Sequence, residues 1–85
     1  MKDELKYVKK SKYRTGVIKS IEEYPKMPSQ IARDCEIAQN HISNTLKQLK
    51  EIDLVECMNP EVKKGRLYRL TDKGEKIAEK LETNE

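Results

Sequence analysis

The sequence predicts a small, mainly helical domain with one two-stranded hairpin. In four segments, apolar residues recur at steps of three or four, which is the period of a helix that buries one face. Residues 54–57 are instead typical of a strand, and residues 66–70 alternate polar and apolar as its partner would. Asn59, Pro60 and Gly65 between them mark a turn-rich tip. At 85 residues the chain is long enough for one domain with a modest core.

Charge is plentiful and unevenly distributed. Charged residues make up 39% of the chain, and the net charge is +3. Basic residues gather in residues 1–14 and again in residues 59–70, whereas most acidic residues lie elsewhere. Separated basic patches favour a polyanionic partner, although chance clustering on a solvated surface gives the same pattern.

The composition argues against several classes of protein. No stretch approaches the ~20 apolar residues of a membrane span, and no signal-peptide pattern opens the chain. Two cysteines do not make a secreted disulfide framework. We therefore expect a cytoplasmic protein that makes no membrane contact.

The first clear helix begins after Ser11. Ser11 suits the N-cap, and the helical apolar pattern that follows runs through Ile21 to Tyr24. Pro25 then ends the helix, because the residue before a proline is pushed out of helical geometry. Residues 1–10 are rich in lysine and form either a basic N-terminal arm or the start of a helix.

A short second helix and a tight turn follow. Pro28 suits the first turn of a helix, where its missing N–H is not needed. Ile31 and Cys35 lie on the inner face of this helix, and Glu36 and Ile37 form the turn. No Gly is present there, although many turns between paired helices contain one.

The third helix, about residues 38–51, has an unusual outer face. Ile42, Leu46 and Leu49 give the buried stripe. The opposite face is rich in amide and hydroxyl side chains, which are mediocre helix formers but present the donors and acceptors that match base edges. A merely polar, solvated face is the alternative. The residues of this face are Gln39, Asn40, Ser43, Asn44, Lys47 and Lys50.

The hairpin and a last helix complete the chain. Lys63, Lys64 and Arg66 lie at the hairpin tip. Thr71 is a plausible N-cap for a C-terminal helix that, with its tail, occupies residues 72–85. The order helix-helix-helix-strand-strand-helix is the layout of a winged helix-turn-helix, which places its third helix in the major groove of DNA. The hairpin is the wing of this layout.

Several motifs in this order resemble the winged-helix transcriptional regulators of the MarR and ArsR type, especially their small archaeal single-domain members. The resemblance covers about residues 11–82. The motifs that carry it are Pro28–Ala32, Ile42-Ser43 with Leu46, Ile52-Asp53-Leu54-Val55 and Leu70-Thr71-Asp72-Lys73-Gly74. Two features depart from the family pattern: Ala38 stands where Ser or Thr commonly caps the third helix, and the long terminal helices of full MarR proteins are missing.

The resemblance implies a regulator that binds double-stranded DNA, usually as a two-fold dimer. The base-reading positions of the family fall here on Gln39, Asn40, His41, Ser43, Asn44 and Lys47, and its wing positions fall on Lys63, Lys64 and Arg66. Four further residues are placed to contact the DNA backbone from the first two helices, by charge or from a helix start. They are Lys12, Arg14, Ser29 and Gln30.

Other chemistries have weaker support. His41, Cys35 and Cys57 invite a metal or redox interpretation, but there is only one His and no paired-cysteine motif, and buried Cys commonly behaves as a small apolar residue. The sequence has no phosphate-cradling Gly-rich loop and no partner for a catalytic His. We expect no enzyme activity, no metal and no cofactor; the sequence does not identify a small-molecule effector.

The sequence thus predicts a sequence-specific DNA-binding regulator, with the third helix in the major groove and the wing on the backbone or in the minor groove. A homodimer is expected because one helix reads too few base pairs for a unique site. Its interface is expected to use Leu5, Tyr7 and Val8 with Ile77 and Leu81. The alternatives are a nonspecific architectural DNA-binding protein and a winged helix that binds only other proteins.

Overall fold

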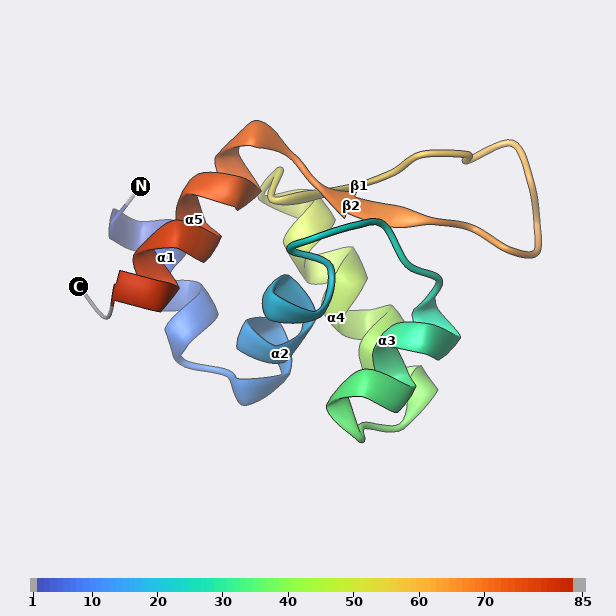
Figure 1. The fold of residues 1–85 in the computed structure, drawn as a ribbon, viewed down its shortest axis with the longest axis horizontal. Helices are drawn as coiled ribbons and strands as arrows, with labels where there is room; N and C mark the ends of the chain where they lie inside the picture. Colours follow the sequence, from blue (N-terminus) through green and yellow to red (C-terminus); the bar gives the residue numbers. More distant parts are fainter. Residues whose placement is uncertain (1, 84–85) are drawn as a thin grey trace.

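The computed structural model describes residues 2–83 and confirms the mainly helical fold with a two-stranded wing (Figure 1). The described residues form five helices and one antiparallel sheet, so a helix precedes the elements that the sequence predicted. In chain order the elements are α1 (Lys2–Lys9), α2 (Lys12–Ser20), α3 (Pro28–Cys35), α4 (Gln39–Glu51), β1 (Val55–Cys57), β2 (Tyr68–Leu70) and α5 (Asp72–Thr83).

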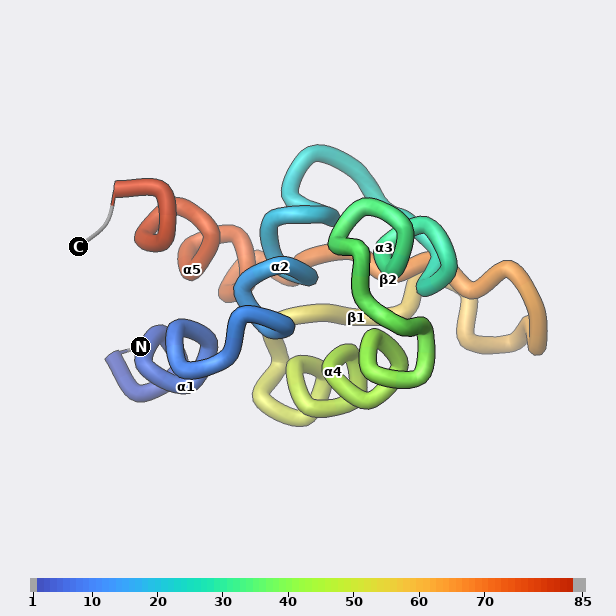
Figure 2. The backbone as a smooth tube through the Cα atoms, turned by 90° about the horizontal axis from the view of Figure 1, so that it is seen from below, coloured from blue at the N-terminus to red at the C-terminus, as the bar shows by residue number. Residues whose placement is uncertain are grey.

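A single aliphatic core holds these elements together. Helices α2 and α4 cross at its centre, and every helix and both strands contribute to it. The buried apolar residues are Val8, Val17, Ile18, Ile21, Ile31, Ile42, Leu46, Leu49, Leu54, Val55, Leu70, Ile77 and Ala78. The wing extends from one end of the molecule, and α1 and α5 lie at the other (Figures 1 and 2).

Helix α2 begins as predicted and ends earlier. The side chain of Ser11 accepts a hydrogen bond from the Arg14 amide at 3.3 Å, which makes Ser11 the N-cap. The helix stops at Ser20, however, and Tyr24 is 59% exposed, so extending the helical pattern to Tyr24 was wrong. The reason is tertiary: after Ile21 the chain turns so that Lys26 can exchange two backbone hydrogen bonds with Tyr68 of β2.

The α3–α4 turn forms without glycine. Pro28 is the first residue of α3, as predicted, and Glu36 ends the helix in the left-handed region with a φ of 56°. The Ile37 amide then donates to the Ala32 carbonyl at 3.0 Å, which closes the turn. A left-handed non-glycine residue is uncommon, so the fold holds Glu36 in a conformation that its residue type does not favour.

The wing is a short ladder with a long tip. Strands β1 and β2 pair with Val55 opposite Leu70 and Cys57 opposite Tyr68. Both strands are shorter than the segments that the sequence predicted: β1 begins one residue later, at Val55, and β2 begins two residues later, at Tyr68. Residues 58–67 form the loop between them. The bridge between Lys26 and Tyr68 adds the segment before α3 to the edge of this sheet.

Helices α1 and α5 pack against each other within the chain. Val8 and Ile77 are both fully buried in its core, so they do not form a surface for a second copy, and the predicted dimer interface is wrong at these two residues. The ammonium group of Lys73 also pairs with the Glu4 carboxylate at 2.8 Å, which joins α5 to α1. In the part of the chain described, no helix is both long and apolar enough to cross a membrane.

Candidate nucleic-acid interface

The outer face of α4 is polar and open to solvent along its first three turns. The buried stripe of Ile42, Leu46 and Leu49 fixes how the helix is rotated on the core. The predicted base-reading side chains are therefore turned outward together. All six are exposed: Gln39, Asn40, His41, Ser43, Asn44 and Lys47.

Side chains of helix α2 contact α4 along one side. The ring of Tyr13 lies 5.3 Å from the ring of His41, and the Thr45 hydroxyl donates to the His41 carbonyl at 2.8 Å. One turn later, the Arg14 guanidinium donates to the Gln48 side chain at 3.2 Å. His41 is thus in contact with α2 through Tyr13.

Arg14 is held inside the chain by three contacts. Besides Gln48, its guanidinium donates to the Tyr7 carbonyl at 2.8 Å and lies 3.6 Å from the centre of the Tyr7 ring. These contacts connect α1, α2 and α4. A contact between Arg14 and a phosphate would have to break all three of these contacts.

The wing tip carries two exposed lysines and one arginine that is folded back. Lys63 and Lys64 are exposed. Arg66 is exposed too, but its Nε donates to the Val62 carbonyl at 2.6 Å and a terminal nitrogen donates to the Pro60 carbonyl at 3.3 Å. The fourth basic residue of the hairpin, Arg69, pairs with Glu56 at 2.7 Å and does not belong to the tip.

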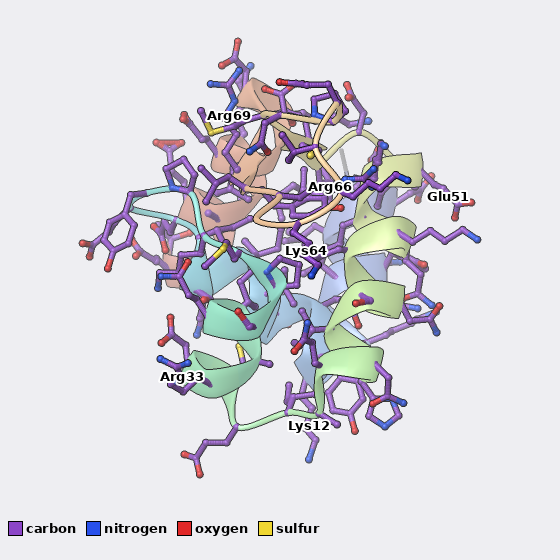
Figure 3. All side chains as sticks on the ribbon, turned by 90° about the vertical axis from the view of Figure 1, so that its right-hand side faces the viewer. Lys12, Arg33, Glu51, Lys64, Arg66 and Arg69 are labelled. Carbon is purple, nitrogen blue, oxygen red and sulfur yellow. The ribbon has the colours of Figure 1, made fainter. Side chains whose placement is uncertain are left out.

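A cleft lies between the wing and the starts of α3 and α4. Its volume is about 300 Å³. Figure 3 looks at the molecule from the wing end, and Lys64 and Arg66 lie between α3 and α4 in this view. The residues that line the cleft are Met27, Pro28, Ser29, Gln39, Lys63, Lys64, Gly65, Arg66 and Tyr68. The fold thus brings together three basic residues of the wing, Ser29 of α3 and Gln39 of α4.

The remaining predicted backbone contacts are divided. Ser29 lines the cleft, but the Gln30 side chain accepts a hydrogen bond from the Met27 amide at 2.9 Å and so caps its own helix. Lys12 lies in a separate hollow beside the α3–α4 turn, together with Glu36 and Ala38. Of these three residues, only Ser29 shares the cleft with the wing lysines.

The sequence model of a family described as winged helix-turn-helix matches residues 10–85. The chain belongs to the winged helix-turn-helix family. No curated protein matches it in sequence.

Solved structures share the fold of this winged helix at low sequence identity. A variant of Lactococcus lactis ZitR has a TM-score of 0.77 and 20% identity, over 86% of this chain and 51% of that chain. A MarR family transcription regulator, SP03579, gives 0.79 and 17% over 98% and 61%. The transcriptional regulator Tm0710 from Thermotoga maritima gives 0.77 and 18% over 96% and 58%. The winged helix described here therefore spans about half the length of ZitR.

Polar contacts tie the end of α3 to the residues that precede this helix. Asp34 of α3 accepts hydrogen bonds from Lys26 and from Ser20, and the Lys26 ammonium holds the pKa of this carboxyl below its usual value. Burial raises the pKa of the Cys35 thiol above its usual value. Among residues 2–83, no group of three or more His, Cys, Asp or Glu side chains is placed to hold a metal ion.

Sequence reasoning missed two residues of the winged helix that shape this surface. Tyr13 lies in the helical apolar pattern that follows Ser11 and had no predicted role at this surface, yet its ring lies 5.3 Å from that of His41. Asn59 appeared only as a turn residue, yet its side chain bonds to the backbone on the far side of the wing. For Asn59 a signal existed, because Asn in turns commonly bonds to nearby backbone; nothing in the sequence pairs Tyr13 with His41.

Proposed function

We propose that this protein is a transcriptional regulator that binds double-stranded DNA and recognises its sequence. The observation that carries the proposal is the joint exposure of the amide-rich face of α4 and the basic cleft, with Gln39 belonging to both. Membership of the winged helix-turn-helix family and the shared fold of MarR-family regulators support it.

In this proposal, α4 contacts bases, and the wing contacts phosphates. Helix α4 enters the major groove, where Gln39, Asn40 and Asn44 pair with adenine N6 and N7 through their amides. Ser43, Lys47 and His41 complete the reading face, with His41 held by Tyr13. The wing lysines and Ser29 contact phosphates, which supply affinity and register without reading sequence.

The functional unit would be a homodimer. One α4 contacts only a few base pairs, whereas two copies related by a two-fold axis read two half-sites about one helical turn apart. The interface excludes Val8 and Ile77, which are already buried, and uses residues that remain partly exposed on α1 and α5, such as Leu5 and Leu81. Occupancy of such an operator would block or recruit the transcription machinery.

Selection from a random duplex library at about 0.15 M salt, followed by sequencing, tests this proposal, because nonspecific binding weakens at that salt concentration. A two-fold motif with half-sites about 10 base pairs apart is the expected result. Bound DNA without an enriched motif would replace the proposal with an architectural role. Failure to recover any duplex would favour a winged helix that binds other proteins.

Two substitutions distinguish recognition of bases from binding of phosphates. Asn44→Ala should weaken binding to the selected site by about 1–3 kcal/mol and relax preference at one base pair, because Asn44 would contact a base. Lys63→Ala should weaken binding to every duplex alike and lower the dependence of affinity on salt by about one unit, because it would contact a phosphate. Titrations on matched and mismatched duplexes at several salt concentrations measure both; the reverse pattern would exchange the two roles.

A further inference from the structure

The side chain of Asn59 closes the tip of the wing from within. Its Oδ1 accepts a hydrogen bond from the Leu67 amide at 2.8 Å, and its Nδ2 donates to the Gly65 carbonyl at 3.1 Å. The Met58 amide also donates to the Leu67 carbonyl at 2.8 Å. One neutral side chain therefore joins the segment that follows β1 to the segment that precedes β2, beyond the point where the β-ladder ends.

Arg66 supplies a second set of hydrogen bonds within the same tip. Its two hydrogen bonds, to the carbonyls of Val62 and Pro60, span the outer half of the loop. The Val62 amide donates in turn to the Asn59 carbonyl at 3.2 Å, which forms a turn. The guanidinium is thereby used to satisfy loop carbonyls that no strand partner reaches.

Along the chain, Lys63 and Lys64 lie between Val62, whose carbonyl accepts from Arg66, and Gly65, whose carbonyl accepts from Asn59. They follow Val62 and precede Gly65, which has a φ of 75° that an L side chain rarely adopts. The loop of residues 58–67 would otherwise sample many conformations, and ordering it on binding would subtract from affinity. With both sets of bonds in place, the two lysines already line the cleft opposite Ser29 and Gln39.

We propose that Asn59 and Arg66 are positioning residues that fold the wing tip before DNA arrives, so that Lys63 and Lys64 contact phosphates. The inference rests on the proposed DNA binding. In it, Asn59 makes no contact with DNA, and the donor geometry of Arg66 matters more than its charge.

The decisive experiment measures how affinity for duplex DNA depends on salt. Asn59→Ala removes no charge, yet it should lower the slope of log affinity against log salt by about one to two units, because each lost phosphate contact contributes about 0.9. Binding at 0.05 M salt should weaken roughly tenfold. In the Lys63→Ala/Lys64→Ala background, Asn59→Ala should have almost no further effect, because the residues it positions are gone.

Arg66→Lys provides the second variant. It keeps the positive charge but lacks the planar set of donors that reaches two carbonyls at once. Arg66→Lys should lower the salt slope as Asn59→Ala does. A salt slope equal to that of the unaltered protein would show that charge alone accounts for Arg66, and would overturn its role as a positioning residue.

Hydrogen exchange of the Leu67 amide tests the folded tip without any DNA. Asn59→Ala should speed this exchange at least tenfold, whereas Asn59→Asp, which keeps the acceptor, should restore most of the protection. Glu61→Gln, an exposed change in the same loop, is the matched control and should leave it unchanged. An unchanged Leu67 exchange rate, or an unchanged salt slope in a variant that still binds, would overturn the inference. Absence of duplex binding by the unaltered protein would instead refute the proposed function, while the exchange result would still test the tip.

Discussion

Gly74 shows how one residue can be required by its surroundings rather than by its own conformation. Its amide donates to the Thr71 hydroxyl at 3.0 Å, and the same hydroxyl donates to the Asp53 carbonyl at 2.6 Å. A Cβ on Gly74 would lie 2.0 Å from the Leu54 carbonyl oxygen. The motif Leu70–Gly74, seen in the sequence only as a resemblance, thus has a physical basis: Thr71 caps α5, and Gly74 lets α5 start against the backbone that leads into β1.

Gly74→Ala should therefore destabilise the fold by about 2 kcal/mol or more, because backbone rather than a movable side chain must shift. Urea unfolding monitored by circular dichroism measures the change. Gly16→Ala is the matched control, since the nearest atom to its new Cβ would be the Cys35 sulfur at 3.3 Å. That sulfur can move, and a helical Ala is favoured over Gly by up to about 1 kcal/mol, so this variant should be close to neutral. Equal losses in the two variants would contradict the packing argument.

At the scale of elements, the helix starts differ in how well they are capped. Ser11 and Thr71 cap α2 and α5 with their side chains. Ala38 begins α4 without a side-chain hydrogen bond, although its backbone already has the extended ψ of 140° that an N-cap residue uses. The helix proposed to read DNA thus begins without a side-chain hydrogen bond from its N-cap residue.

Ala38→Ser should stabilise the protein by about 1 kcal/mol, because the new hydroxyl can accept a hydrogen bond from an amide in the first turn of α4. Ser11→Ala, which removes an existing cap, should cost a similar amount in the opposite direction. Thermal and urea unfolding of both variants measure these changes. A loss of stability in Ala38→Ser would show that α4 cannot accept a side-chain cap in this fold.

The contact between α1 and α5 predicts a dependence on pH. The hydrogen bond from Lys73 lowers the pKa of Glu4 from 4.5 to about 2. A carboxyl with a lowered pKa stabilises the fold at pH values above its unfolded pKa, and this contribution is lost as the pH falls from about 4.5 towards 2. Unfolding measured from pH 7 down to pH 2 should show that Glu4→Gln lowers stability at pH 7 and that the difference largely disappears near pH 2. Asp3→Asn, on the same helix but exposed, is the control; a difference for Glu4→Gln that does not vary with pH would refute the assignment.

For the whole molecule, the position of charge matters more than the total of +3. Lys63 and Lys64 lie at the wing tip, whereas Lys76 and Lys80 are exposed on α5, which lies towards the opposite end of the molecule (Figure 1). Binding that depends on local phosphate contacts should distinguish these two pairs, although replacing either pair by alanine removes the same charge.

Lys63→Ala/Lys64→Ala should lower the salt slope of duplex binding by about two units, because two phosphate contacts are lost. Lys76→Ala/Lys80→Ala should leave the slope nearly unchanged and weaken binding only slightly through the long-range field, which salt screens within about 10 Å at 0.1 M. Fluorescence anisotropy titrations over a range of salt concentrations measure both pairs. Equal slopes for the two double variants would indicate that the chain binds DNA through its overall charge.

Much of the fold was determined by the sequence itself. The spacing of Ile42, Leu46 and Leu49 fixes the outward face of α4, because a helix has only one way to bury such a stripe. Ser11, Pro28 and Thr71 mark helix starts by local chemistry that needs no partner from elsewhere in the chain. The elements and the composition of the candidate reading face could therefore be predicted.

Only the tertiary structure decided what depends on residues far apart in the sequence. The pairing of Lys26 with Tyr68 ended α2 before Tyr24, and the packing of α1 on α5 buried Val8 and Ile77. The same kind of contact joined Arg14 to Gln48 of α4 and placed the wing lysines opposite the start of α3. Local preferences select helices, strands and turns within a few residues, whereas burial and the hydrogen bonds of long side chains depend on which elements the fold brings together.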